Sequence, residues 1–209
     1  MMANALIEEA KKIFPKLAGF EGFYLAGGTA LALQVGHRVS VDFDLFSPSG
    51  ISKQLLAKVE KVFAGSKINV AQNSSDELTV FVDGVKITFL RYPFGVYKNF
   101  VETDGLKILA PETIALTKAY TIGRRGSYKD YVDLYFLLSG EYTTLENILQ
   151  DCQKIYSDAF SDRLFLEQLV YMKDIDEIEI RYLDKKVKKG DLEEFFEIEV
   201  REFGKTHHS

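Results

Sequence analysis

The stretch YLAGGTALALQVGHRVSVDFDLF, residues 24–46, decides the fold of this chain. It joins a glycine-rich turn, a short apolar segment and a run in which polar and apolar residues alternate. Glycines before an apolar segment predict a tight turn into a helix, and alternation with a period of two predicts a strand. We therefore expect a turn, a helix and a strand in close succession, with two aspartates on the strand.

The alternating run SVDFDLF predicts two faces: Val41, Phe43 and Leu45 on one, and Ser40, Asp42 and Asp44 on the other. Residues two apart in a strand share a face and lie about 6.5 Å apart along the chain. Asp42 and Asp44 can therefore converge on one divalent cation, and Mg²⁺ prefers one or two carboxylates completed by substrate phosphates. The alternative is that both carboxylates simply face solvent on an edge strand.

The glycines offer a second feature beside these aspartates. Gly27 and Gly28 precede Thr29, which suits the N-cap of the helix that follows. Glycines let a backbone approach a phosphate closely, and the free N–H groups and dipole of a helix N-terminus favour an anion. The alternative is an ordinary tight turn with a threonine cap. His37 and Arg38, in the loop before the strand, either touch a phosphate or belong to a solvated loop.

The rest of the chain predicts a mixed α/β first half and an all-α second half. In the first half the spacing predicts helices over 4–17, ending near Pro15, and over 52–63, with strands over 67–72 and 77–94 that turn at Asp83-Gly84. In the second half it predicts helices over 111–122, 128–139, 144–155, 161–172 and 191–203, with Gly123 and Gly126 ending the first. The fold class is α/β (α+β): a small mixed sheet flanked by helices in 1–110, then a helical part in 111–209. A single merged core would give the same pattern.

Composition restricts the setting of the protein. Of the 209 residues, 46% are hydrophobic, which is typical of a globular chain, and no apolar run is long enough to span a membrane. The single Cys152 excludes an internal disulfide framework and suits a reducing compartment, so we expect a cytoplasmic protein without a membrane partner. The net charge of −5 argues against indiscriminate nucleic-acid binding, yet residues 118–129 are basic and contain no acid.

Lys118 is unusual within this basic segment. It shares a helical stripe with Ile114 and Ile122, so it either snorkels to solvent or points into a cleft and meets a phosphate. Asp130 and Asp133 lie three residues apart on the next helix, and Asp133 neighbours the inward apolar residues. A buried carboxylate needs a partner, and Lys118 can provide one. The pair is either a structural link between two helices or a device in which Asp133 orients Lys118 or faces a nucleotide.

Two segments together resemble a known family. GGTALAL followed by GHRVSVDFDLF, and PETIALTKAYTIGRRGSYKDYVDLYFLL at 111–138, resemble the AbiEii/AbiGii toxin family. This family belongs to the polymerase-β-like nucleotidyltransferase superfamily and is related to type IV and MenT-type toxins. The resemblance implies a catalytic α/β core, with a helical C-terminal part that completes the active-site cleft. It also matches Lys118 to the family's nucleotide-contacting lysine.

The resemblance implies a nucleotidyltransferase that moves a nucleoside monophosphate from an NTP to an acceptor hydroxyl, on RNA such as tRNA, under the control of a cognate antitoxin. The implied metal ligands for Mg²⁺ or Mn²⁺ are Asp42 and Asp44, and the implied catalytic set adds Lys118 and Asp133. The residues implied in nucleotide binding are Gly27, Gly28, Thr29, Arg38, Ser40 and Lys118. The implied RNA contacts are Arg124, Arg125 and Lys129. Two alternatives remain: an enzyme whose acceptor is a small molecule or a protein, and an inactive nucleotide-binding or interaction module.

The sequence departs from the superfamily in one respect. Such enzymes place a third carboxylate on a neighbouring strand, where it helps to deprotonate the attacking hydroxyl. The corresponding strand here, VKITFLRY, offers Lys86, Thr88 and Leu90 on its central positions and no acid, and Asp83 belongs to the turn. Either Asp133 supplies the missing charge, or metal alone activates the acceptor, or the enzyme is impaired.

Overall fold

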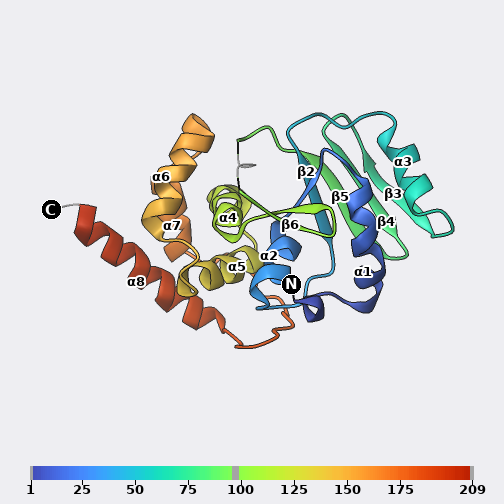
Figure 1. Ribbon diagram of the computed structural model, residues 1–209. Helices are drawn as coiled ribbons and strands as arrows, with labels where there is room; N and C mark the ends of the chain where they lie inside the picture. The colour runs from blue at the N-terminus through green and yellow to red at the C-terminus, as the bar shows by residue number, and fades with distance from the viewer. Residues whose placement is uncertain (1, 96–98, 208–209) are drawn as a thin grey trace. The chain divides into compact units, whose positions relative to one another are not determined.

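The computed structural model describes residues 2–95 and 99–207, which form two compact units, Met1–Ala110 and Pro111–Ser209. The first contains a mixed sheet and its flanking helices, and the second contains helices (Figure 1). No helix in the described part of the chain is long and apolar enough to cross a membrane.

The first unit is built on a seven-stranded sheet in the order β3-β4-β5-β2-β1-β7-β6. The strands are β1 (Tyr24–Ala26), β2 (Phe43–Ser47), β3 (Ile68–Asn73), β4 (Glu77–Val82), β5 (Val85–Arg91), β6 (Phe100–Thr103) and β7 (Leu106–Leu109). The central strand β2 runs antiparallel to β1 and parallel to β5. The helices of this first unit are η1 (Ala3–Ala5), α1 (Glu8–Ile13), η2 (Phe14–Gly19), α2 (Gly27–Val35) and α3 (Leu55–Val62).

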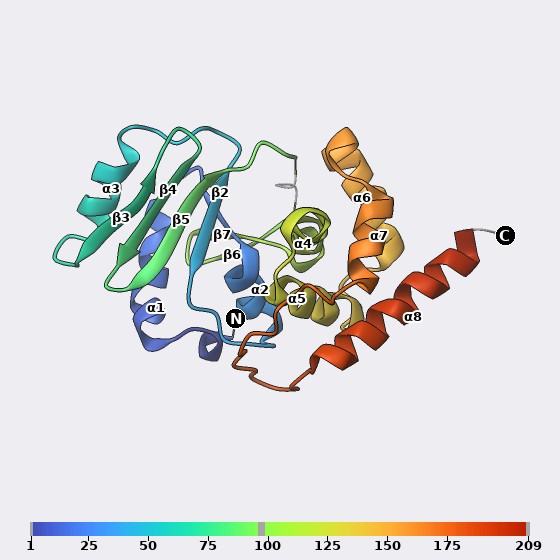
Figure 2. The ribbon, with the colours of Figure 1, turned by 180° about the vertical axis from the view of Figure 1, so that it is seen from behind.

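One face of the sheet forms the core of this unit. Phe43 and Leu45 of β2 and Phe89 of β5 are completely buried on it. Phe14 stacks on Phe43 with ring centroids 6.2 Å apart, and Phe20 meets Phe89 at 4.8 Å. The segment α1–η2 therefore covers this face, and α1 passes in front of the strands in Figure 1 and behind them in Figure 2. Asp44 lies on the opposite face of the sheet.

Several sequence expectations for this unit are confirmed and others are wrong. The turn at Asp83-Gly84 is confirmed, with φ of 49° and 89°, as a two-residue hairpin requires. The helix expected over 4–17 divides into η1, α1 and η2, and strands β1, β6 and β7 were not expected. The strand expected over 40–46 begins only at Phe43, and Val41 is 40% exposed instead of sharing the buried face.

The second unit contains α4 (Pro111–Arg125), α5 (Tyr128–Ser139), α6 (Leu145–Tyr156), η3 (Ser157–Ala159), α7 (Asp162–Val170) and α8 (Lys189–His207). Helices α4 and α5 pack against each other, and α7 packs against both α4 and α8. The expected end of α4 near residue 122 is wrong, because the helix continues through Gly123 to Arg125. A single glycine within a helix costs about 1 kcal/mol, which tertiary packing can offset.

Candidate active site

Asp42 and Asp44 lie at the start of β2, separated by the buried Phe43. Asp44 is within the strand and pairs in register with Ala26 of β1, whereas Asp42 immediately precedes the strand. Both aspartates are partly exposed, and Phe43 points into the core face. Asp44, which alternates with the buried Phe43 and Leu45, therefore lies on the face of the sheet opposite the core, whereas the alternation does not extend to Asp42.

Gly27 explains how the Asp44 carboxylate fits against the start of α2. The φ of Gly27 is 66°, in the left-handed region that favours glycine. A Cβ placed on Gly27 would lie 2.4 Å from Oδ2 of Asp44, a distance that no side chain tolerates. The Asp44 carboxylate can therefore lie beside the helix N-terminus only because residue 27 has no side chain.

The side chain of the N-cap residue of α2 makes no cap hydrogen bond, and the expected N-cap role of Thr29 is wrong. The N-cap is Ala26, and no acidic residue lies in the first turn of the helix. Backbone N–H groups at the start of a helix lack intrahelical partners, and with the helix dipole they favour an anion. The start of α2 thus offers an anion-binding end next to the carboxylate of Asp44.

Thr29 instead holds the loop that carries Asp42. Its side chain is buried, and its hydroxyl contacts both the Ser40 hydroxyl, at 2.7 Å, and the backbone carbonyl of Asp42. A carbonyl can only accept, so Thr29 donates its one hydrogen to Asp42, and Ser40 donates to Thr29. Thr29 and Ser40, both expected in nucleotide binding, therefore fix the backbone at Asp42.

The loop before Asp42 is buried. His37 is 2% exposed and Arg38 is 3% exposed, which excludes the solvated loop. One guanidinium nitrogen of Arg38 donates to the carbonyl of Val39 at 3.3 Å. A buried arginine keeps its charge, so this loop places a fixed cation four residues before Asp42.

The aspartates at this site would suit a divalent ion that also binds substrate. Among the described residues, no group of three or more His, Cys, Asp or Glu side chains is arranged to hold a metal. The paired carboxylates of Asp42 and Asp44 are hard oxygen donors that suit Mg²⁺ when phosphate oxygens complete its coordination.

Lys118 lies in a buried ionic cluster of the second unit. Its side chain comes from α4 and is 7% exposed, so the snorkelling interpretation is wrong. The ammonium Nζ lies 2.6 Å from Oδ2 of Asp133 and 2.8 Å from Oδ1 of Asp130, both on α5. Asp133 is completely buried, as expected. The cluster holds Lys118 between two carboxylates, so its ammonium is fixed in place.

Asp130 was not expected in this cluster. Its second carboxylate oxygen accepts hydrogen bonds from the backbone N–H of Ser127, at 2.9 Å, and from the Ser127 hydroxyl, at 2.7 Å. Burial raises the pKa of Asp130, but the charge and hydrogen bond of Lys118 and the bonds from Ser127 outweigh burial and lower that pKa. The spacing of Ser127 and Asp130, which resembles a capping box, was the signal available in the sequence.

The basic residues expected to contact RNA differ in their surroundings. Arg124 lies over the ring of Tyr120, with its Cζ 3.8 Å from the centroid, and also donates to the carbonyl of Ala159. Arg125 is exposed, and Lys129 is partly exposed. Both arginines are exposed, but Arg124 is engaged by Tyr120 and Ala159 within its own unit.

The strand next to β2 has no acid, as the sequence indicated. Asp44 pairs in register with Thr88 of β5, so Thr88 occupies the place where a carboxylate was sought. Asp83 lies in the turn, where its carboxylate accepts from the backbone N–H of Lys67 at 2.9 Å. Asp133 is tied to Lys118, so its negative charge is already partnered within its unit.

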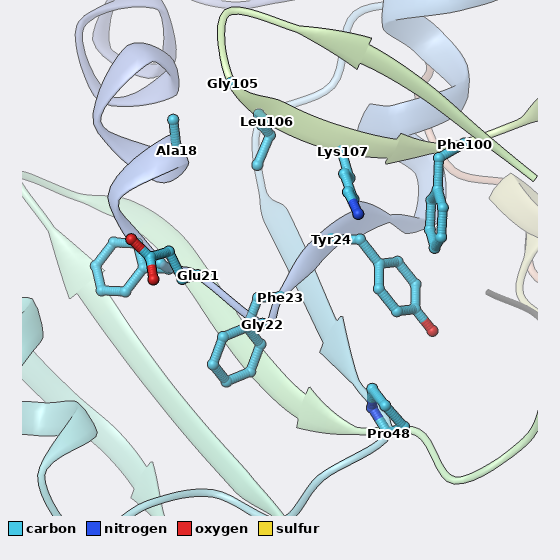
Figure 3. Close-up of a pocket in the computed structure, with 11 residues that line it drawn as sticks. Ala18, Glu21, Gly22, Phe23, Tyr24, Pro48, Phe100, Gly105, Leu106 and Lys107 are labelled. Atoms are coloured by element: carbon cyan, nitrogen blue, oxygen red, sulfur yellow. The ribbon is translucent and has the colours of Figure 1, made fainter.

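A separate pocket of about 330 Å³ opens at the other end of β1 (Figure 3). Its lining includes the aromatic rings of Phe23, Tyr24 and Phe100, together with Glu21 and Lys107. None of the residues expected in catalysis or nucleotide binding lines it. The candidate active site is therefore the group of residues around Asp44, not this pocket.

Comparisons with known proteins bear on the family of this chain. Residues 11–203 match the family described as nucleotidyl transferase AbiEii toxin, type IV TA system. An uncharacterised protein of Aquifex aeolicus (strain VF5) is 35% identical over 191 residues, covering 87% of each chain.

The fold is also similar to solved structures. JHP933 from Helicobacter pylori superposes with a TM-score of 0.55 at 19% identity, covering 97% of both chains. A second structure from H. pylori gives the same TM-score and identity and covers 96% of this chain and 95% of its own. At this identity the likeness concerns the fold. The family match, over nearly the whole chain, carries the assignment: the protein is a nucleotidyltransferase that belongs to the AbiEii toxin family of type IV toxin–antitoxin systems.

Proposed function

We propose that the protein transfers a nucleoside monophosphate from an NTP to a hydroxyl of RNA, with tRNA as the first acceptor to test, in a reaction that depends on Mg²⁺. One observation carries the proposal: the carboxylate of Asp44 lies beside the start of α2, where Gly27 makes the room for it, and Asp42 lies two residues earlier. Metal-binding carboxylates and an anion-binding helix end are thus adjacent.

Each part of this site has a role in the proposed reaction. Asp42 and Asp44 hold Mg²⁺ or Mn²⁺, which neutralises charge on the phosphates and favours departure of pyrophosphate. The backbone N–H groups at Gly28 and Thr29 bind oxygens of the triphosphate tail. Thr29 and Ser40 keep Asp42 in place through their hydroxyl contacts.

The chemical step is an in-line displacement at the α-phosphorus. The acceptor oxygen forms a bond to phosphorus, the bond from that phosphorus to the bridging oxygen breaks, and the acceptor proton leaves to water. Most of the rate enhancement in such a reaction comes from positioning and from electrostatic stabilisation. We propose that Lys118 neutralises charge on the triphosphate and that Asp130 and Asp133 hold its ammonium for that purpose.

The acceptor assignment rests on the basic surface of the second unit. Arg124, Arg125 and Lys129 supply positive charge that phosphates of an RNA backbone would attract. The type IV family suggests that an antitoxin restrains the enzyme. The acceptor and the antitoxin are both part of the proposal.

A transfer assay tests the proposal. The protein is incubated with Mg²⁺, each α-³²P-labelled NTP in turn and total tRNA, and labelled RNA is measured. Asp42→Asn and Asp44→Asn should abolish labelling, because they keep the side-chain shape but remove the charge that binds the metal. Asp104→Asn is the matched control: Asp104 is an exposed aspartate with φ of 49° in the same unit, a conformation that asparagine tolerates.

The outcomes separate the alternatives. Labelled RNA that depends on both Asp42 and Asp44 supports the proposal. Release of pyrophosphate without labelled RNA would replace the RNA with a small-molecule or protein acceptor. NTP binding with neither labelled RNA nor pyrophosphate would contradict the catalytic proposal.

A further inference from the structure

Asp44 has two flanks, and they differ in chemistry. On the β1 side its carboxylate lies against Gly27 and the start of α2, where the triphosphate is proposed to bind. On the other side its register partner is Thr88 of β5, about 5 Å away in a sheet. In a displacement reaction the acceptor must approach from the side away from the leaving pyrophosphate. The β5 flank is therefore the side from which an acceptor hydroxyl would enter.

Thr88 begins a row of polar side chains that crosses the sheet on the face of Asp44. Thr88 pairs in register with Thr79 of β4, and their hydroxyl oxygens lie 3.3 Å apart. The Thr79 hydroxyl also lies 2.7 Å from Oε1 of Glu77. Thr79 is 5% exposed and Thr88 is 9% exposed, so both residues are largely shielded from bulk water, and Thr88 keeps a small exposed surface.

The row has a defined hydrogen-bond direction. An ionised carboxylate can only accept, so Thr79 donates its single hydroxyl hydrogen to Glu77. Thr79 then has no hydrogen for Thr88, and at their contact Thr88 must donate to Thr79. Hydrogen bonds in such a chain polarise one another, so the charge of Glu77 raises the electron density on the Thr88 oxygen. Because Thr88 gives its one hydroxyl hydrogen to Thr79, its oxygen is left as an acceptor of further hydrogen bonds.

We propose that the Thr88 oxygen accepts a hydrogen bond from the acceptor hydroxyl, and that Thr79 and Glu77 are positioning residues that fix this accepting orientation. This inference rests on the proposed function, and it assigns the acceptor subsite to the β5 flank of Asp44. Thr88 orients the attacking oxygen, whose lone pair then faces the α-phosphorus; as the new O–P bond forms, the O–H bond breaks and the proton that was shared with Thr88 is released to water. A threonine linked through Thr79 to a carboxylate on the neighbouring strand β4 thus stands where a carboxylate was expected.

The test compares the kinetics of transfer for hydroxyl-free variants. Thr88→Val keeps the shape of the side chain and removes its oxygen. We expect the acceptor kcat/KM to fall about 3- to 10-fold, the size of one net hydrogen bond, with the KM for the NTP unchanged. Thr88→Ser should remain near wild type. Glu77→Gln lets the amide donate to Thr79, which reverses the row and points the Thr88 hydrogen outward, so it should lower the acceptor kcat/KM as well.

Matched controls come from β6, on the far edge of the same sheet. Thr103→Val and Glu102→Gln remove the same groups from positions that do not contact the row, and they should leave both kinetic constants unchanged. Thermal unfolding of each variant checks that the fold is intact.

The outcomes are distinct from those of the proposed function. If wild-type protein transfers nucleotide but Thr88→Val and Glu77→Gln leave the acceptor kcat/KM unchanged, the acceptor subsite is refuted and the proposed function stands. An equal fall in kcat/KM for the NTP and for the acceptor would also refute the acceptor subsite, because a general structural defect would lower both. If the wild type transfers nothing, both proposals fail.

Discussion

At the scale of single residues, the position of Asp44 in the candidate site depends on Gly27. Its φ of 66° and its contact with Asp44 make two separate demands on this position. The first is a backbone conformation that costs other residues about 1–2 kcal/mol. The second is empty space where the Asp44 carboxylate lies. An alanine at Gly27 would violate both.

The first prediction tests the backbone conformation and the empty space at Gly27 separately. Gly27→Ala should lower the free energy of unfolding by about 1–2 kcal/mol and should also displace the Asp44 carboxylate. A shift of about 1 Å in a catalytic group can reduce the rate about 100-fold. Gly65→Ala is the control, because Gly65 has φ of 89° but nothing within 4 Å of its Cβ position. Equal losses of transfer activity in both variants would show that backbone strain alone is responsible.

Thr29 shows what the sequence predicts poorly at this scale. The pattern predicted a helix after two glycines and a strand carrying two aspartates, but the helix includes both glycines and only Asp44 lies within the strand. It assigned Thr29 to the N-cap because threonine favours that position. The helix begins at Gly27 instead, and Thr29 becomes a buried anchor for the Asp42 carbonyl. A local preference cannot reveal a contact that spans 13 residues and depends on how β2 returns beside the helix.

At the scale of elements, α4 and α5 are joined by the ionic cluster of Lys118, Asp130 and Asp133. Periodicity placed Lys118 on a buried stripe and Asp133 beside apolar residues, and both are buried. Short strands were harder to predict. Strand β1 has three residues and β7 has four, which is too few for alternation to be recognised, so the partners of β2 and β6 only became clear in the assembled sheet.

The second prediction concerns the pH dependence of this cluster. Because the pKa of Asp130 is lowered in the folded state, its contribution to stability is present above its ordinary value of 3.8 and is lost as the pH falls through the lowered pKa. Asp130→Asn lacks this ionisation. The difference in urea-unfolding free energy between wild type and Asp130→Asn should therefore be constant from about pH 5 upward and shrink below about pH 4.

Taking the difference between wild type and Asp130→Asn cancels the contributions of most other carboxylates to stability, because those carboxylates titrate in both proteins. Asp158→Asn, at an exposed aspartate of η3, provides the control and should give a difference near zero throughout. A difference for Asp130→Asn that grows on acidification would mean that burial, not Lys118, governs the ionisation of Asp130.

At the scale of the whole molecule, a net charge of −5 coexists with an exposed basic position at the end of α4. An acidic protein repels a polyanion at long range, so RNA binding must depend on a few local contacts. Arg125 is exposed, whereas Arg124 is stacked on Tyr120 and bonded to Ala159. The sequence predicted the same RNA-contacting role for these two arginines, and only their surroundings in the structure distinguish them.

The third prediction is that Arg125→Ala weakens tRNA binding and lowers the slope of log K against log salt by about one unit, as the loss of one phosphate contact requires. Its free energy of unfolding should stay near wild type, since the side chain is exposed. Lys61→Ala, at an exposed lysine of α3, is the control and should change neither quantity. Binding measured by fluorescence anisotropy from 50 to 200 mM salt decides the matter. If Arg125→Ala and Lys61→Ala bind tRNA alike while transfer to RNA persists, the acceptor is held elsewhere, and the charge at the end of α4 has no part in choosing it.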